Sequence, residues 1–378
     1  MRIGIDAMQL WGEWTGVGRS VWEVARRLAA DGQGHEFVFY ASRGFLRGDE
    51  LVSERFHVRR TWFHARRRTL RILWQQMCLP FRATKDNVAV LHAPAYVMPV
   101  LSYVPTVVTV HDTIAFRYPA FVGRGSVAHL RRFLPKSLER AQLVTVPSRT
   151  VGRDLGELFG TPREKIRVIP FGVGPEFRPL DSDERARARE ELGLARPYVL
   201  FVGRIEAKKN IQRVVEGFFA AVLARRLPHD LVLAGPASRS RGLDRLISEL
   251  GMAGRVRRTG YVPDEELPRL YAAADLVLLP SIVEGFGFPL LEAMASGTPC
   301  VISRDPALAE LAAGAAARVP ATRLDRLRET IEQLLAVPEE AARLRDLGLA
   351  RAREFTWERT VELTLAAYAE ARERYEGR

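Results

Sequence analysis

Short runs of β-branched and large apolar residues alternate with helical stretches along most of the chain, and this alternation limits the fold more than any other feature. In the first half the strand-like runs are Ile3–Ala7, Phe37–Tyr40, Val88–Leu91, Val107–Val110 and Leu143–Val146. The second half repeats the scheme with Tyr198–Val202, Leu231–Ala234, Val256–Thr259, Leu276–Leu279 and Cys300–Ser303. Apolar runs separated by helices are typical of parallel strands that are covered on both faces. The pattern predicts an α/β fold with two Rossmann-like domains in sequence.

The length and the prolines predict where the domains meet. A chain of 378 residues is too long for one compact core, so two domains are expected. Within 169–180, three prolines and two glycines disfavour regular structure. We therefore expect one domain over residues 1–172, a second over 173–355, and a C-terminal helix over 356–378 that can cross back to the first domain.

Charge is spread unevenly along the chain. The net charge is +12, and residues 1–180 hold 27 Lys or Arg against 15 Asp or Glu, which accounts for the whole excess. A basic half of this kind is compatible with a nucleic acid, an anionic membrane or a phosphorylated substrate. The two cysteines, Cys78 and Cys300, exclude a disulfide framework and a cysteine-based zinc site.

The N-terminal residues and the hydropathy of the chain bear on its location. The first residues lack the apolar core of a signal peptide. No run reaches the ~18 apolar residues that are needed to cross a bilayer. We therefore expect a cytoplasmic protein.

Residues 284–300 contain the most specific motif of the chain. Two carboxylates, Glu284 and Glu292, surround a glycine-aromatic turn that leads into a predicted helix. Pro289 suits the first helical position, so the N–H groups of residues 287–290 would be free at a helix N-terminus, which is suited to an anion. This layout predicts a ligand with a central diphosphate and a hydroxylated ring at each carboxylate, the shape of a nucleotide sugar. In the alternative interpretation Glu284 caps the helix and Glu292 is solvated.

Three further loops follow predicted strands, where the ligands of doubly wound sheets lie. Arg204 and Lys209 can converge on one diphosphate, unless they belong to a charged surface turn. Gly16 lies at a strand-to-helix turn whose backbone can approach a phosphate closely, although a plain glycine loop has the same composition. His111 and Asp112 could offer a donor and a carboxylate to a sugar, unless Asp112 only caps the following turn.

These loops together resemble glycosyltransferase family 4, a group of retaining enzymes with the GT-B fold, in which two Rossmann-like domains face each other across a cleft. The resemblance covers nearly the whole chain. It rests on Thr-Gly-Val-Gly-Arg at 15–19, Val-Thr-Val-His-Asp at 108–112, Phe-Val-Gly-Arg at 201–204 with Lys209 and Asn210, and the block 284–292. The linker departs from the family pattern at Phe171 and Gly174, where Asn and Asp are usual.

The resemblance implies a role for each motif residue. Arg204 and Lys209 would stabilise the leaving diphosphate, and Gly16 would border it from the other domain. Glu284 and His111 would contact the transferred sugar. The Glu292 carboxylate would bind the ribose hydroxyls. The backbone N–H groups of Phe286, Gly287, Phe288 and Leu290 would bind the diphosphate and the sugar. The backbone of Gly260, Tyr261 and Val262 would bind the base.

The resemblance also implies the reaction. A hexose would move from a nucleotide sugar to a saccharide or lipid-linked acceptor in polysaccharide or glycoconjugate assembly, with retention and without a cofactor or a metal. The motifs look most like those of mannosyltransferases, which favours GDP-mannose over UDP-glucose. The Asp181-Ser182-Asp183 motif could bind a metal instead, but helix capping explains it well.

A basic segment at 62–85 remains outside these motifs. Leu70, Leu73, Trp74 and Met77 have the spacing of one helical stripe, with Arg66, Arg67, Arg68 and Arg71 beside it. The stripe predicts a helix that faces the core and carries solvated arginines. The alternative is a helix on a membrane surface, with the protein peripheral at the inner membrane face.

Other functional classes are also open at this stage. A non-catalytic nucleotide-sugar-binding protein would keep the same donor motifs. A nucleic-acid-binding protein would suit the basic half, but no known binding module is present. A dinucleotide oxidoreductase is disfavoured because valine at position 21 breaks the Gly-x-Gly-x-x-Gly fingerprint.

Overall fold

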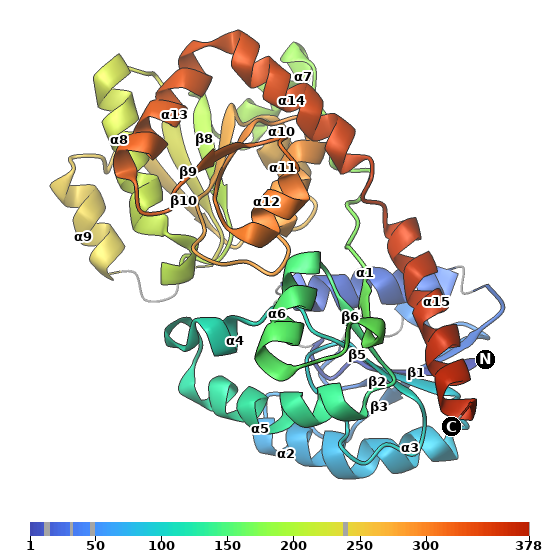
Figure 1. Ribbon diagram of the computed structural model, residues 1–378. Helices are drawn as coiled ribbons and strands as arrows, with labels where there is room; N and C mark the ends of the chain where they lie inside the picture. The colour runs from blue at the N-terminus through green and yellow to red at the C-terminus, as the bar shows by residue number, and fades with distance from the viewer. Residues whose placement is uncertain (11–15, 31–32, 46–49, 237–240, 378) are drawn as a thin grey trace. The chain divides into compact units, whose positions relative to one another are not determined.

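The computed structural model describes residues 1–10, 16–30, 33–45, 50–236 and 241–377. The chain divides into two compact units, one of residues 1–172 with 356–378 and the other of residues 173–355. Each unit is a parallel sheet with helices on both faces (Figure 1). The α/β prediction with two Rossmann-like domains is therefore confirmed.

The first unit contains a seven-stranded parallel sheet in the order β3-β2-β1-β4-β5-β6-β7. Its strands are β1 (Arg2–Asp6), β2 (Glu36–Ala41), β3 (Phe56–Arg60), β4 (Val90–Ala93), β5 (Thr106–Thr109), β6 (Leu143–Val146) and β7 (Ile166–Val168). Its α-helices are α1 (Gly16–Ala30), α2 (Arg68–Leu73), α3 (Leu79–Lys85), α4 (Ile114–Arg117), α5 (Arg124–Arg140), α6 (Arg149–Phe159) and α15 (Trp357–Glu376). The central strands β4, β5 and β6 are buried at every residue, so the core lies on both sides of them.

The second unit contains a six-stranded parallel sheet in the order β10-β9-β8-β11-β12-β13. Its strands are β8 (Tyr198–Val202), β9 (Asp230–Ala234), β10 (Val256–Gly260), β11 (Leu276–Leu279), β12 (Cys300–Ser303) and β13 (Ala317–Val319). Its α-helices are α7 (Ser182–Glu191), α8 (Ile211–Arg225), α9 (Arg241–Glu249), α10 (Leu267–Ala272), α11 (Phe288–Ala295), α12 (Pro306–Ala312), α13 (Leu324–Ala336) and α14 (Pro338–Ala352).

Each of the ten predicted strands is present within two residues of its predicted bounds. The alternation did not predict β3, β7 and β13. These three strands are short or only partly buried, and each lies at an edge of its sheet. An edge strand needs no continuous apolar run because one of its sides has no neighbouring strand.

The chain passes between the two units at two places. Gly172 is the last residue of the first unit before the chain enters the second. It packs against the backbone of Thr356 and Trp357, so closely that a Cβ on Gly172 would lie 2.2 Å from the Trp357 nitrogen. The Val173 N–H donates to the Phe355 carbonyl at 3.1 Å. Helix α15 then packs into the core of the first unit, and its Tyr368 hydroxyl hydrogen-bonds His92 Nδ1 at 2.7 Å.

The prediction of one core-facing helical stripe at 70–77 is wrong. A π-helical turn over 74–78 separates α2 from α3. Leu70 and Trp74 are partly buried and pack inward, whereas Leu73 and Met77 are exposed. Leu70 and Leu73 both precede the π-turn and point about 60° apart around α2, so only one edge of the predicted stripe reaches the core.

The outward residues of this segment form an apolar surface together with the loop between β4 and β5. We call Leu73, Met77, Phe81, Leu101 and Tyr103 the apolar surface, and each is between 50% and 64% exposed. The Phe81 and Tyr103 rings lie 5.6 Å apart. In a continuous α-helix Leu73 and Phe81 would point about 80° apart. The π-turn reduces this angle, so Leu73, Met77 and Phe81 follow one line. No helix among the described residues is long and apolar enough to span a membrane.

Candidate active site

An ion pair joins two loops at the carboxyl edge of the second sheet. Lys209 lies in the loop after β8, and Glu284 lies in the loop after β11, the next strand in the sheet. Lys209 Nζ donates to Glu284 Oε1 at 2.5 Å, and each side chain is only 12% exposed. The two loops are also joined through the Ile282 N–H, which donates to the Lys208 carbonyl at 2.8 Å. The structure thus brings two of the predicted site residues into direct contact.

Asn210 fixes the position of Lys209. Its backbone is left-handed, with φ at 57°, and its side-chain amide donates to the carbonyls of Pro280 at 3.1 Å and Ala321 at 2.8 Å. Asparagine tolerates this conformation better than most residues. The adjacent Lys208 pairs with Glu206 at 3.3 Å.

Arg204 follows β8 in the same loop and differs from Lys209 in its surroundings. Its side chain is exposed, and within the described residues it has no carboxylate partner. The turn before it is tight, since a Cβ on Gly235 would lie 2.2 Å from the Gly203 carbonyl oxygen. Both glycines have positive φ, at 143° for Gly203 and 136° for Gly235. An exposed guanidinium on a close-packed turn can bind an anion without first breaking an ion pair.

The N-terminus of α11 lies beside the Glu284 loop. The helix begins at Phe288, which makes Pro289 its second residue rather than its first. Gly287 is the N-cap, with φ at 111°, and no side chain caps this end, so the interpretation of Glu284 as the cap is wrong. Within the described chain the Gly287 N–H has no acceptor. This helix end therefore has the positive character that favours an anion.

One predicted N–H donor is already occupied. The Leu290 N–H donates to the Gly287 carbonyl at 3.0 Å, which corrects its prediction as a free donor. The left-handed N-cap turns the Gly287 carbonyl into the first helical turn, where the N–H of Leu291 also reaches it at 3.2 Å. Phe286 is buried, and its ring lies edge-on to the ring of Phe288 at 5.5 Å, which packs this turn.

Asp305 supports the Glu284 loop from α12. One carboxylate oxygen accepts from the Glu284 N–H at 3.2 Å, and the other caps α12 by accepting from the Leu308 N–H at 3.0 Å. Burial raises the pKa of Asp305 to about 6, and the charge of Glu284 raises it as well. Burial alone would also raise the pKa of Glu284, but Lys209 outweighs it and holds this pKa below its ordinary value. Glu284 is therefore a carboxylate at neutral pH.

Glu292 lies one turn inside α11 and is only 3% exposed. The interpretation of Glu292 as a solvated residue is therefore wrong. Its carboxylate belongs to the helix whose N-terminus lies beside the Glu284 loop.

The segment predicted for the base lies at the end of β10. Gly260 has φ at 71°, Tyr261 is about half exposed and Val262 is buried. Tyr261 and Val262 border a cavity of about 450 Å³ that also reaches α10 and the end of α7. The cavity has room for a planar ring beside the backbone of this segment.

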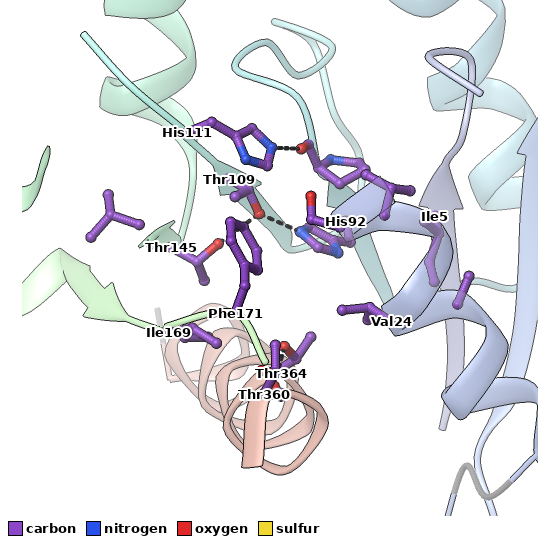
Figure 2. Close-up of a pocket in the computed structure, with 15 residues that line it drawn as sticks. Ile5, Val24, His92, Thr109, His111, Thr145, Ile169, Phe171, Thr360 and Thr364 are labelled. Atoms are coloured by element: carbon purple, nitrogen blue, oxygen red, sulfur yellow. Dashed lines mark hydrogen bonds between the residues drawn. The ribbon is translucent and has the colours of Figure 1, made fainter. Parts of the chain in front are cut away.

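In the first unit, His111 lies in the loop after β5 and is buried. Its Nε2 is 2.6 Å from the Pro94 carbonyl, so this nitrogen carries the proton and donates (Figure 2). Burial lowers the pKa of His111, which keeps the ring neutral at pH 7 and leaves Nδ1 as an acceptor. The ring stacks on Phe171 with centroids 5.7 Å apart.

The alternative interpretation of Asp112 is confirmed. One carboxylate oxygen accepts from the Ile114 N–H at 3.0 Å, and the other accepts from the Tyr96 hydroxyl at 2.6 Å. Both oxygens are thus used inside the first unit. Asp112 orders the loop that carries His111.

A cavity of about 40 Å³ lies beside His111 and Phe171 (Figure 2). The Thr109 hydroxyl hydrogen-bonds His92 Nε2 and the Thr145 hydroxyl, each at 2.7 Å. Burial lowers the pKa of His92 to about 3, so its ring is neutral. This chain of hydrogen bonds ends at Tyr368 and fixes α15 to the sheet.

Gly16 is the first residue of α1 and is exposed. Thr15, which precedes it in the predicted phosphate loop, lies outside the described residues. A helix N-terminus in the first unit therefore lies where the motif predicted one.

The Asp181 motif acts as a helix cap. The Asp181 carboxylate accepts a hydrogen bond from the Glu184 N–H, and the Glu184 carboxylate accepts one from the Asp181 N–H. Among the residues that the structure describes, no cluster of three His, Cys, Asp or Glu side chains could hold a metal ion.

The motifs did not reveal two residues that the structure connects to predicted ones. Asp305 precedes Pro306, and an aspartate before a proline is a helix N-cap signal, but nothing local links it to Glu284. His92 lies within an apolar strand. A histidine in a buried strand indicates that hydrogen-bonding partners lie nearby, but the sequence does not show which residues they are.

Two family models match the chain. Residues 14–177 match the model described as Glycosyltransferase Family 4, and residues 182–349 match the model described as Glycosyl transferases group 1. The boundary between the two matches lies a few residues after the division between the two units at Gly172.

Individual proteins are similar over almost the full length. An Escherichia coli O-antigen chain mannosyltransferase B is 29% identical over 94% of this chain and 96% of its own. A sucrose-phosphate synthase from Thermosynechococcus elongatus has a TM-score of 0.78, at 21% identity over 98% of both chains. Anabaena HepE in complex with UDP-glucose has a TM-score of 0.76, at 18% identity over 97% of this chain and 100% of its own.

Proposed function

This chain belongs to the family 4 glycosyltransferases of the GT-B fold, and from that membership we propose that it transfers a hexose from a nucleotide sugar with retention of the anomeric configuration. The donor is GDP-mannose and the acceptor is a saccharide or a lipid-linked saccharide. The similarity to a mannosyltransferase of O-antigen chains supports mannose. The UDP-glucose complex of Anabaena HepE supports a nucleotide-sugar donor in general.

The observation that carries the proposal is the grouping of Arg204, the Lys209–Glu284 pair and the N-terminus of α11 at the carboxyl edge of one sheet. Breaking a bond between a sugar and a diphosphate builds negative charge on the leaving oxygens. Two cations and a helix N-terminus stabilise that charge most strongly where water is excluded. Glu284 then contacts the sugar, and Glu292 accepts hydrogen bonds from the ribose hydroxyls.

Lys209 has to serve two anions in this scheme. In the absence of donor it neutralises the buried Glu284. When the diphosphate arrives, the ammonium group, which has three donors, can keep Glu284 while a second N–H contacts a phosphate oxygen. Glu284 thereby holds Lys209 in place before the substrate binds. Preorganised donors of this kind need little rearrangement at the moment of reaction.

His111 contributes from the first unit as an acceptor. Because its Nε2 donates to Pro94, a hydroxyl of the transferred hexose would donate to its Nδ1. We assign no proton transfer to His111. In the proposed retaining step the acceptor hydroxyl attacks from the side of the leaving group, and a diphosphate oxygen takes its proton. No carboxylate of the protein is needed as a base.

Metal independence is a further part of the proposal. Arg204 and Lys209 supply the positive charge that a divalent cation would otherwise bring to a diphosphate. The carboxylates of Glu284 and Asp181 are already engaged, with Lys209 and with the α7 backbone respectively.

Peripheral attachment to an anionic membrane is the last part. The apolar surface can enter the headgroup region, while Arg66, Arg67, Arg82 and Lys85 are exposed along the same segment. Each basic residue near an anionic surface adds about 1 kcal/mol of attraction. Apolar side chains flanked by cations favour such a surface over a soluble acidic partner.

A panel of sugar nucleotides measured by thermal shift tests the donor. GDP-mannose should raise the melting temperature more than UDP-glucose, because a ligand stabilises the folded state in proportion to its occupancy. The product of the reaction with the donor that binds, formed in the presence of EDTA, should have the α-anomeric configuration of that donor by NMR. An inverted product, or a strict need for a divalent cation, would refute the mechanism.

A further inference from the structure

Two segments of the first unit are basic without any acidic residue. Residues 61–85 carry six Lys or Arg and no Asp or Glu, and residues 113–138 carry five and none. Several arginines elsewhere in the described chain pair with a carboxylate, among them Arg185, Arg189 and Arg255. Here Arg117 pairs with Asp154 and Glu157, but within the described chain Arg68, Arg71, Arg124, Arg131 and Arg132 have no carboxylate within 4.0 Å. Solubility requires charged residues on the surface, but it does not require segments that carry only basic ones.

The fold brings the two segments together at the carboxyl edge of the first sheet. Helix α2 follows β3, and α5 follows β5. The Arg68 guanidinium donates to the Gly125 carbonyl in the first turn of α5, which joins the starts of the two helices. Gln75 donates to Asp6 at the end of β1 at 2.7 Å, so the α2 segment lies over the strand ends. Ligands of doubly wound sheets bind at this edge.

Helix spacing brings three side chains of this region near one another: Arg71 lies one turn after Arg68 in α2, and His129 lies one turn after Gly125, the partner of Arg68, in α5. His129 of α5 interacts electrostatically with both Arg68 and Arg71, and burial together with these two charges lowers the pKa of His129 to about 4. Burial lowers the pKa of Arg71; the charge of Asp6 opposes this shift, and the charge of Arg68 adds to it. Asp6 is itself engaged with Gln75 and the Met8 N–H. Because no described carboxylate lies within 4.0 Å of Arg68 or Arg71, the positive charge of this cluster can attract an anion.

We propose that Arg68, Arg71 and His129 bind a phosphate group of the acceptor substrate, so that the acceptor is a phosphate or diphosphate ester rather than a neutral saccharide. This inference rests on the proposed transferase function. Arg68 keeps guanidinium N–H groups beyond the one that bonds Gly125, and a guanidinium is suited to two phosphate oxygens at once. Arg204 and Lys209 belong to the other unit and are not among the residues of this site.

A lipid headgroup carries the same chemistry as an acceptor phosphate. The placement favours the acceptor, because the cluster is at the strand ends and its three side chains are partly buried. A site for many headgroups would use exposed side chains, as Arg66, Arg67 and Lys85 do. The experiment therefore measures the two sources separately.

Calorimetric titration with inorganic pyrophosphate tests the site in the presence of saturating GDP, which fills the donor site. Wild type should bind pyrophosphate, and Arg68→Gln with Arg71→Gln should weaken that binding tenfold or more while GDP affinity stays the same. Arg43→Gln with Arg163→Gln removes two exposed charges from the same unit and should change the binding less than twofold. If the double variant does not fold, Arg68→Gln alone carries the test.

The outcomes separate the two proposals. Equal pyrophosphate binding by wild type and the Arg68 and Arg71 variants would overturn the site, whatever GDP does. A loss seen only in binding to phosphatidylglycerol vesicles, and not to pyrophosphate, would assign the cluster to the membrane and also overturn it. Absence of GDP and UDP binding, with arginine-dependent pyrophosphate binding retained, would refute the donor assignment and support the anion site.

Discussion

Lys209 Nζ and Glu284 Oε1 lie 2.5 Å apart, although the two residues are separated by 75 positions in the sequence. The pair joins the loops after two neighbouring strands and leaves each side chain almost buried. Removal of either partner therefore leaves a buried charge without compensation, which is costly. This relationship determines how variants of the site have to be designed.

Lys209→Ala should lower kcat by about 10²–10³-fold, the loss typical of one preorganised donor at a developing negative charge. Steady-state kinetics with the sugar nucleotide that gives the largest thermal shift would measure this. Glu284→Gln in combination with Lys209→Ala removes the unpaired carboxylate and should recover stability without activity. Lys208→Ala is the matched control, since Lys208 pairs with Glu206 instead. Equal losses in both lysine variants would contradict the role of Lys209.

Glu292→Ala should mainly weaken donor binding, by about tenfold or more, because a hydrogen bond to a charged group contributes roughly 1.5–3 kcal/mol. Titration calorimetry with the nucleoside diphosphate would measure it. Glu310→Ala, on the next helix α12, is the comparison. Near-normal nucleotide affinity of the Glu292 variant would remove its ribose role.

Gly287→Ala should lower stability by roughly 1–3 kcal/mol, the cost of a non-glycine residue in an unfavourable backbone conformation. Its φ is 111°, and a Cβ would lie 2.6 Å from Leu308 Cδ2. Chemical denaturation would measure the loss. Combination with Leu308→Ala relieves the contact but not the backbone strain. The double variant should therefore recover only part of the stability that Gly287→Ala removes. Gly123→Ala, with open space at its Cβ position, should be nearly neutral.

Asp305 should make stability depend on pH. Burial raises its pKa in the folded state to about 6 from an ordinary value of 3.8. The folded protein therefore binds this proton more tightly than the unfolded chain does. Ionised Asp305 lowers the stability of the fold above pH 6, and protonation restores that stability as the pH falls toward 4. Relative to Asp305→Asn, the free energy of unfolding of wild type should fall by about 2 kcal/mol between pH 4.5 and 7.5. Urea denaturation at both pH values would measure the difference.

The control for this pH effect is Asp181→Asn. Asp181 also caps a helix but is exposed, so its variant should differ from wild type by the same amount at both pH values. A pH-independent difference for Asp305→Asn would mean that its carboxylate is ionised throughout this range.

Replacement of Leu73, Met77 and Phe81 by glutamine should abolish flotation with anionic liposomes while thermal stability is kept, because these side chains are exposed. Each side chain contributes about 1.5–3 kcal/mol when it is fully buried in an apolar phase. The control replaces the exposed apolar residues Leu223, Val337 and Leu347 of the second unit in the same way. Wild-type protein that does not float at either low or high salt would end the membrane proposal.

The sequence by itself determined the two parallel sheets, since continuous apolar runs between helices admit few other arrangements. It also marked Arg204, Lys209, Glu284 and Glu292 through glycine-rich turns after strands. Tertiary structure alone decided which of these meet, because crossover connections bring residues far apart in sequence to one sheet edge. The Lys209–Glu284 pair, the support from Asp305 and the outward line of Leu73 and Met77 depend on sheet order and one π-turn. No local pattern of residue types encodes those features.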